Sequence, residues 1–211
     1  MLSALKNSLP LTLAVCVTIL SCSDGKSTKS TVNPVNIQPS AEVQEKKRAA
    51  TLDKSPMDVA YYPEDFPVLK MSGKIGGDPV ARIIYSRPSK DGRTIFGNVV
   101  KYGTYWRLGA NESSEIEFFR DVRIIGKTVK KGRYIIYCVP YEKKWTIKLN
   151  SDLYTWGLSV HSAKDVYSFD VPTNASPNDF DVLTMRFGPV KNGARLLIAW
   201  DNVITYLPFT F

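Results

Sequence analysis

The sequence contains a single histidine, His161, in 211 residues. This scarcity excludes zinc sites built from several histidines and the metalloprotease motif that needs two. A serine hydrolase triad would have to use His161, yet the chain has no GxSxG nucleophile motif. Residues 73–77 indicate a turn rather than a phosphate-binding loop, and no calcium-loop pattern occurs. We therefore expect no metal and no cofactor, and we expect His161 on a surface loop.

Cysteine is also scarce, with only Cys16, Cys22 and Cys138. The first two lie in the amino-terminal segment, so no disulfide can form within the part of the chain that holds Cys138. The apolar neighbours of Cys138 predict a small buried residue on a strand. A catalytic thiol is the alternative, but such a thiol needs a base nearby.

Clustered charge of one sign is missing, although the net charge is +8. Residues 57–211 hold 21 basic and 16 acidic side chains, spread along the segment. Nucleic-acid binding requires a basic patch or stripe, so we expect no nucleic-acid partner. A basic surface near anionic lipid or glycan is the simpler interpretation.

No apolar run is long enough to cross a membrane as a helix. Residues 9–20 are almost wholly apolar and follow Lys6, but a spanning helix needs about twenty such residues. A charged start, a short apolar middle and a small residue at the end are typical of a signal peptide, here residues 1–21. Residues 19–22, Ile-Leu-Ser-Cys, resemble a lipobox with Cys22 as the acylated residue. Cys16 is the rival acceptor, and ordinary secretion without lipid is the alternative.

Residues 22–56 predict a flexible linker that begins at the lipid-acceptor cysteine. They are rich in small polar and charged residues and have too few large apolar side chains to form a core. We therefore expect a protein of the cell envelope, held by lipid on Cys22 at the outer membrane and facing either the periplasm or the surface. Its membrane partner would be contacted through that lipid.

From residue 57 onward, apolar and polar residues alternate in short runs. The runs lie at residues 80–85, 115–125, 134–139, 145–149, 167–171, 183–187, 194–200 and 203–211, and residues 126–132 indicate a turn. Alternation of period two, broken by Gly, Pro, Asn and Asp, predicts antiparallel strands with one buried face. Residues 57–211 are therefore predicted to form a single all-β domain, an antiparallel β-sandwich of jelly-roll-like type. An outer-membrane barrel is disfavoured, because charged side chains recur in many runs.

Three segments form a distinctive pattern: Tyr-Ser-Arg-Pro at 85–88, Gly-Arg-Thr-Ile-Phe-Gly at 92–97, and Tyr-Gly-Thr-Tyr-Trp-Arg-Leu-Gly-Ala-Asn-Glu at 102–112. This pattern resembles the signature of the bacterial family called Domain of Unknown Function 2911. Further matches are at 126–127, 132–134, 140, 145–147, 150 and 156–157, whereas Lys101 and Leu108 depart from the family. The resemblance implies a secreted or lipid-anchored β-sandwich. It implies no established activity, so it supplies no catalytic residues.

The signature region also holds the densest group of polar and aromatic side chains. We expect a ligand-binding surface formed by Arg87, Arg93, Trp106, Arg107, Asn111, Glu112 and Trp156. Arginine recognises carboxylate and phosphate groups, and the faces of Trp and Tyr suit sugar rings or peptide side chains. The competing interpretation is structural, in which these arginines and Asn111 hold a long loop to the sandwich.

Three functions remain open on the sequence. The leading one is a non-catalytic domain that binds a glycan, a peptide or an envelope protein. The first rival is a carboxylate-based glycan hydrolase, for which Glu112 needs a second acid in the same cleft. Glu115 and Glu117 are the nearest candidates, but they alternate with Ile116 and Phe118 and are expected to point to solvent on a strand. The second rival is a purely structural component, in which the arginines would be buried against carboxylates and carbonyls with no pocket beside them.

Overall fold

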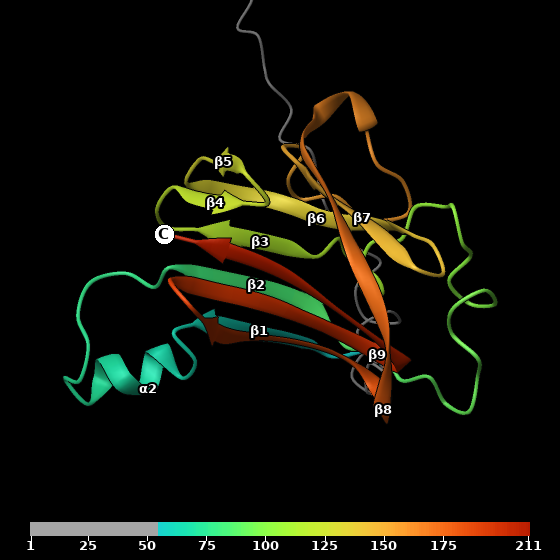
Figure 1. The fold of residues 1–211 in the computed structure, drawn as a ribbon, viewed down its shortest axis with the longest axis horizontal. Coiled ribbons are helices and arrows are strands. Elements are labelled where there is room, and N and C mark those ends of the chain that lie inside the picture. Colours follow the sequence, from blue (N-terminus) through green and yellow to red (C-terminus); the bar gives the residue numbers. More distant parts are fainter. Residues whose placement is uncertain (1–54) are drawn as a thin grey trace, which may run out of the picture. The chain divides into compact units, whose positions relative to one another are not determined.

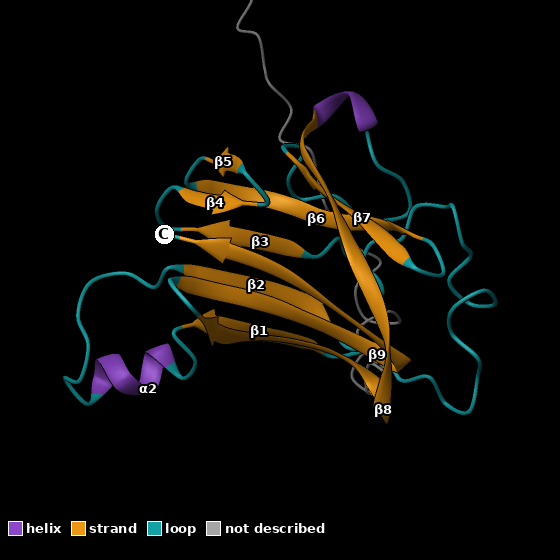
Figure 2. Cartoon of the chain, viewed as in Figure 1, coloured by secondary structure: helices purple, strands orange, loops and turns teal. Residues whose placement is uncertain are grey.

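The structure is a computed structural model that describes residues 55–211. The predicted signal peptide, Cys22 and nearly all of the predicted linker lie outside the described residues. Within residues 55–211 there are nine strands and two short helical segments (Figure 2). The strands are β1 (Met57–Tyr62), β2 (Ala81–Ser86), β3 (Glu115–Phe118), β4 (Val122–Ile124), β5 (Lys127–Val129), β6 (Gly132–Pro140), β7 (Lys144–Asn150), β8 (Asp165–Val190) and β9 (Gly193–Thr210), and the helical segments are α2 (Phe66–Met71) and the 3-10 turn η1 (Ser162–Lys164).

Alternation along the strands separates a buried face from an exposed one, as predicted. In β7, Trp145, Ile147 and Leu149 are buried, whereas Thr146 and Lys148 remain partly exposed. All strand pairs are antiparallel. The expected single antiparallel all-β domain is therefore confirmed. None of the helices among the described residues is both long and apolar enough to span a membrane.

The strands form one continuous sheet in the order β1-β2-β3-β6-β7-β8-β9-β4-β5. β8 belongs to both layers of the fold, because residues 165–172 pair with β7 and residues 173–190 pair with β9. Its register shifts on either side of Phe180, and such bulges bend a strand. In Figure 1, β8 passes diagonally from the layer of β6 and β7 to that of β9. The two expected layers are thus one sheet that folds back on itself.

Aromatic side chains from both layers pack in the core between them. Phe118 of β3 lies edge-on to Phe209 of β9, with ring centroids 5.6 Å apart. Trp106 contacts Trp145 at 5.5 Å and is stacked on Trp200 at 5.9 Å. Large aromatic residues supply much of the buried apolar area that stabilises a domain of this size. The signature region therefore contributes directly to the core.

The structure corrects three details of the predicted strands. Residues 126–132 are not only a turn, since they include β5, which pairs with β4. The run at 115–125 is two strands, β3 and β4, in different layers. The separate runs at 167–171 and 183–187 are parts of β8, and those at 194–200 and 203–211 are parts of β9. The Pro and Asn residues between the first two runs lie within β8, where the register of its pairing with β9 shifts, and do not end the strand.

The two layers also meet at a seam between β1 and the second part of β8. The side chain of Tyr85, on β2, bridges this seam: its hydroxyl accepts the Met185 N–H at 2.9 Å. The same hydroxyl lies 3.2 Å from the Met185 carbonyl and 3.3 Å from the Asp58 carboxylate. Asp58 in turn accepts the Val59 N–H at 2.8 Å. Side chains thus satisfy backbone groups at the strand edges that no neighbouring strand pairs.

Candidate functional site

The loop between β7 and η1, residues 151–161, places Trp156 on the surface. Asn150, fully buried at the end of β7, fixes both ends of this loop. Its side-chain amide donates to the His161 carbonyl at 2.9 Å, and its side-chain oxygen accepts the Asp152 N–H at 2.8 Å. A buried amide with several partners is a rigid anchor, so the loop has a defined position.

The middle of this loop rests on the signature segment. Ser113 donates its N–H to the Thr155 carbonyl at 3.1 Å, and the two hydroxyls lie 2.7 Å apart. The carbonyl of Gly157 accepts hydrogen bonds from the Tyr105 hydroxyl at 3.3 Å and from the Arg107 guanidinium at 3.2 Å. Residues distant in sequence are thereby joined on either side of Trp156.

Gly157 is required where the loop touches the signature segment. Its φ is +81°, in the left-handed region that favours glycine. A Cβ at this position would lie 2.6 Å from Cδ of Arg107 and 3.0 Å from the backbone nitrogen of Ser113. The absence of a side chain therefore allows the close approach that seats Trp156.

An open hollow of about 460 Å³ lies beside Trp156. We call it the Trp156 hollow; its lining residues are Met57, Ile84, Glu112, Ser113, Glu115, Tyr154, Thr155 and Trp156. Ile84 of β2 and Glu115 of β3 are cross-strand neighbours, and their neighbours Ile83 and Ile116 point into the core. The floor of the hollow is thus the outer face of the sheet, and the loop forms its wall.

The wall is unusually apolar for an exposed loop. Trp156 is 57% exposed, Tyr154 79% and Leu158 74%. Tyr154 is held by Arg133, which donates to its hydroxyl at 3.1 Å and lies over its ring at 5.1 Å. Among residues 55–211, Trp156 packs against no other aromatic ring, so much of its indole is exposed to a ligand.

Two carboxylates line the Trp156 hollow and differ in their surroundings. Glu115 forms an ion pair with Arg133, and this hydrogen-bonded contact raises the pKa of the arginine. Glu112 is exposed and makes no ion pair or hydrogen bond within the described part of the chain. The site therefore contains one neutralised and one uncompensated negative charge.

A smaller hollow of about 110 Å³ lies on the other side of Trp156. There Asp152 accepts from Lys164 at 2.6 Å and contacts Nδ1 of His161 at 2.6 Å. The hydrogen bond from Lys164 holds the pKa of Asp152 below its usual value, with a further contribution from His161. His161 is exposed, as expected, and contacts a carboxylate rather than a metal site. Among residues 55–211, no three His, Cys, Asp or Glu side chains gather as metal ligands.

The other predicted site residues are divided between support and core. Arg107 lies beneath the loop and Asn111 lies in the left-handed region, its carbonyl close to Gly157. Trp106 is only 7% exposed and packs among core aromatics. Arg93 donates to the carbonyls of Lys90 and Ser89, at 2.8 and 2.7 Å. The structure thus brings Glu112 and Trp156 together and leaves Trp106 and Arg93 out of the hollow.

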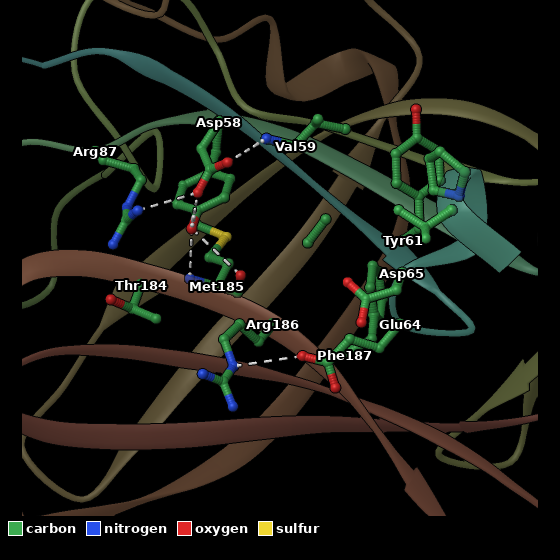
Figure 3. A pocket seen from close by; sticks show the side chains of 14 residues that line it. Asp58, Val59, Tyr61, Glu64, Asp65, Arg87, Thr184, Met185, Arg186 and Phe187 are labelled. Carbon is green, nitrogen blue, oxygen red and sulfur yellow. Dashed lines mark hydrogen bonds and ion pairs between the residues drawn. The ribbon is translucent and has the colours of Figure 1, made fainter.

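Arg87 lines a different hollow, of about 380 Å³, at the seam between β1 and β8 (Figure 3). Its guanidinium pairs with Asp58 at 3.2 Å and donates to the Leu183 carbonyl at 3.3 Å. Across this hollow, Arg186 faces Glu64 at 4.0 Å. Each arginine already has a carboxylate partner, so the seam hollow offers no free cation for an anionic ligand.

Sequence reasoning missed Tyr154, Thr155 and Ser113 as lining residues. Tyr154, Trp156 and Leu158 alternate with Thr155, Gly157 and Ser159, yet this segment forms a loop and not a strand. Large apolar residues in such a loop have no core to enter, so they are expected at the surface. Cys138, by contrast, is buried on β6 as predicted, and burial raises the pKa of its thiol well above the usual value.

The comparisons with known proteins agree with the resemblance seen in the sequence. A family described as "Protein of unknown function (DUF2911)" matches residues 67–209. The comparisons with curated proteins and with solved structures found no match. Since the matched segment covers more than half of the chain, this protein belongs to the DUF2911 family.

Proposed function

We propose that this protein is a non-catalytic glycan-binding protein of the cell envelope, and that glycan binds in the Trp156 hollow. The observation that carries the proposal is the exposed indole of Trp156 beside an open hollow of about 460 Å³ whose lining also includes Glu112, Ser113 and Thr155. Indole and phenol rings present flat apolar faces with one polar edge, which suits the apolar face and hydroxyl edge of a sugar ring.

The fixed position of the loop supports binding rather than a role in packing. Trp156 is held from below by Gly157 and its two donors, Tyr105 and Arg107. Binding against a side chain that is already in place costs less conformational entropy than binding that must first order a loop. The Ser113 and Thr155 hydroxyls and Glu112 supply hydrogen-bonding groups beside the ring.

The proposed location rests on the amino-terminal segment, outside the described residues. We propose that acyl chains on Cys22 hold the protein at the outer membrane, on its periplasmic or outer side. Several acyl chains bind a membrane firmly, since each buried CH₂ contributes about 0.8 kcal/mol. The linker of residues 22–56 would then allow the domain to reach glycan near that membrane.

Replacing the indole tests the proposed function. With the purified full chain on an array of envelope-type oligosaccharides, we expect Trp156→Ala to weaken binding by about tenfold, or about 1.4 kcal/mol. Tyr141→Ala, at an exposed aromatic outside the hollow, should bind like the unmodified protein. Equal binding by Trp156→Ala, or capture on lipid vesicles instead of glycan, would refute the proposal.

A glycan hydrolase is the second candidate, because Glu112 and Glu115 line the same hollow. Glycoside hydrolysis uses two carboxyl groups, one of which must donate a proton. Glu115 is already ion-paired with Arg133, so its carboxylate is not free to approach the oxygen of a glycosidic bond. Release of reducing ends from a bound oligosaccharide, abolished in Glu112→Gln, would establish the hydrolase and displace the binding role.

A further inference from the structure

The charged side chains that line the Trp156 hollow are all acidic. They are Glu112 and Glu115, and neither lysine nor arginine is among the lining residues. Arg133 neutralises Glu115 from outside the hollow. Glu112 has no such partner among residues 55–211, so its charge is available to a ligand.

Two arginines contact residues of the hollow or of its loop without lining it. Arg133 contacts Glu115 and the ring of Tyr154. Arg107 donates to the Gly157 carbonyl, beneath the loop, and does not line the hollow. The residues that line the hollow therefore carry negative charge only, on a domain with an excess of basic residues.

We propose that the Trp156 hollow selects a glycan with a free amino group, a glucosamine-type sugar, over its neutral N-acetylated form. The inference rests on the proposed glycan-binding function. A protonated amine beside Glu112 would form a charge-assisted hydrogen bond. The same cation would be attracted to the negative face of the Trp156 ring. An acetylated nitrogen is uncharged and loses both interactions.

The net positive charge of the whole domain and the acidic lining of the hollow act on a charged ligand in opposite directions. Overall charge favours anionic ligands at long range, whereas the lining of the hollow repels them at contact. A ligand that is cationic at one sugar unit gains from Glu112 without opposing any lining residue. Specificity would thus come from the contact residues rather than from the net charge.

The test compares two oligosaccharides of equal length with the purified full chain. Tetramers of β-1,4-linked glucosamine and of N-acetylglucosamine would be titrated by calorimetry at about pH 5.5, where the sugar amine is charged. We expect the glucosamine tetramer to bind about five- to tenfold more tightly, as for a partly desolvated ion pair. Glu112→Gln should reduce this preference to about onefold, and the matched control Glu142→Gln, on an exposed residue outside the hollow, should preserve it.

The outcomes separate this inference from the function on which it rests. Equal affinity for both tetramers, lost in Trp156→Ala, would overturn the amino-sugar preference and leave glycan binding intact. A preference that survives in Glu112→Gln would also overturn it, because the charge would lie elsewhere. Binding of neither tetramer, nor of any other oligosaccharide, would remove the proposed function together with the inference.

Discussion

Tyr85 is the residue on which the closure of the two layers depends most directly. Its ring is fully buried, and its hydroxyl is the partner of both backbone groups of Met185. Those groups lie on the edge of β8 that faces away from β9. A buried backbone group without a partner is costly, so this hydroxyl substitutes for a missing strand.

Tyr85→Phe should therefore destabilise the domain while keeping the ring in place. We expect the free energy of unfolding to fall by about 1–3 kcal/mol, the cost of leaving buried polar groups unpaired. Urea denaturation followed by tryptophan fluorescence measures the change. Tyr61→Phe is the control, since its hydroxyl has no hydrogen bond within the described residues. Equal stability of the two variants would show that water replaces the Tyr85 hydroxyl.

The ionisation of Tyr85 should lower the stability of the domain at alkaline pH. Burial raises the pKa of Tyr85 to about 12 from its ordinary value of 10.0, and the negative charge of Asp58 adds to the shift. Below pH 10 the Tyr85 hydroxyl is protonated in both the folded and the unfolded chain, so its contribution to the free energy of unfolding is fully present. Between pH 10 and 12 the unfolded chain releases this proton and the folded chain keeps it, so stability falls as pH rises.

Denaturation curves at about pH 9, 10 and 11 would measure this dependence. Burial also raises the pKa of Tyr105 and of Tyr137, so the unmodified protein should lose stability through several tyrosines. Tyr85→Phe should lose less over this interval than the unmodified protein. Parallel curves for the two proteins would contradict the assignment of the loss to Tyr85.

At the scale of elements, the loop of residues 151–161 is the part most sensitive to a small change. Gly157→Ala should cost about 1–3 kcal/mol, because the new side chain meets Arg107 and strains a left-handed backbone. It should also weaken glycan binding by moving Trp156. Thermal melting and binding titration would report the two effects. Gly76→Ala is the matched control, since a Cβ there has open space and its φ is not in the left-handed region.

The strands were predictable because alternation is a local property. Ala81, Ile83 and Tyr85 of β2 are buried in turn, with partly exposed residues between them, as their pattern indicates. The pattern could not show which runs belong to one continuous strand, or which strands pair with each other. β8 reads as two runs because residues 172–182, which include the bulges near Phe180, contain no buried side chain, and β5 is only three residues long. Which strands are neighbours depends on contacts between distant segments.

The candidate site was predictable only in part, for a related reason. Glu112 and Trp156 were expected at one site, and the structure places both in the lining of one hollow. Trp106 was predicted as a ligand-binding residue on the same grounds as Trp156, yet its side chain is buried in the core. Alternation does not extend into the signature loop, so the side of the chain on which each aromatic lies is set by tertiary contacts. Arg93 and Arg107 likewise bind carbonyls that no local pattern identifies.

At the scale of the whole molecule, the anchor and the domain should be separable. We expect Cys22→Ala to move the protein from the membrane fraction to the soluble fraction, because the acyl chains would be lost. Immunoblotting of fractionated cells measures the distribution. Cys16→Ala is the matched control and should leave the protein with the membrane. If Cys16→Ala releases it instead, the acylated residue is Cys16, and membrane retention of both variants would reject a lipid anchor.

The shared strand β8 has a consequence for the folding of the newly made chain. β8 and β9 are the last strands along the sequence, and they hold together the layers formed by the earlier ones. Until they emerge, the apolar side of β2, β3, β6 and β7 has no covering layer. A layer that is completed this late leaves apolar surface exposed, and such surface aggregates. Truncation within the final forty or so residues should thus yield an insoluble product rather than a smaller folded domain.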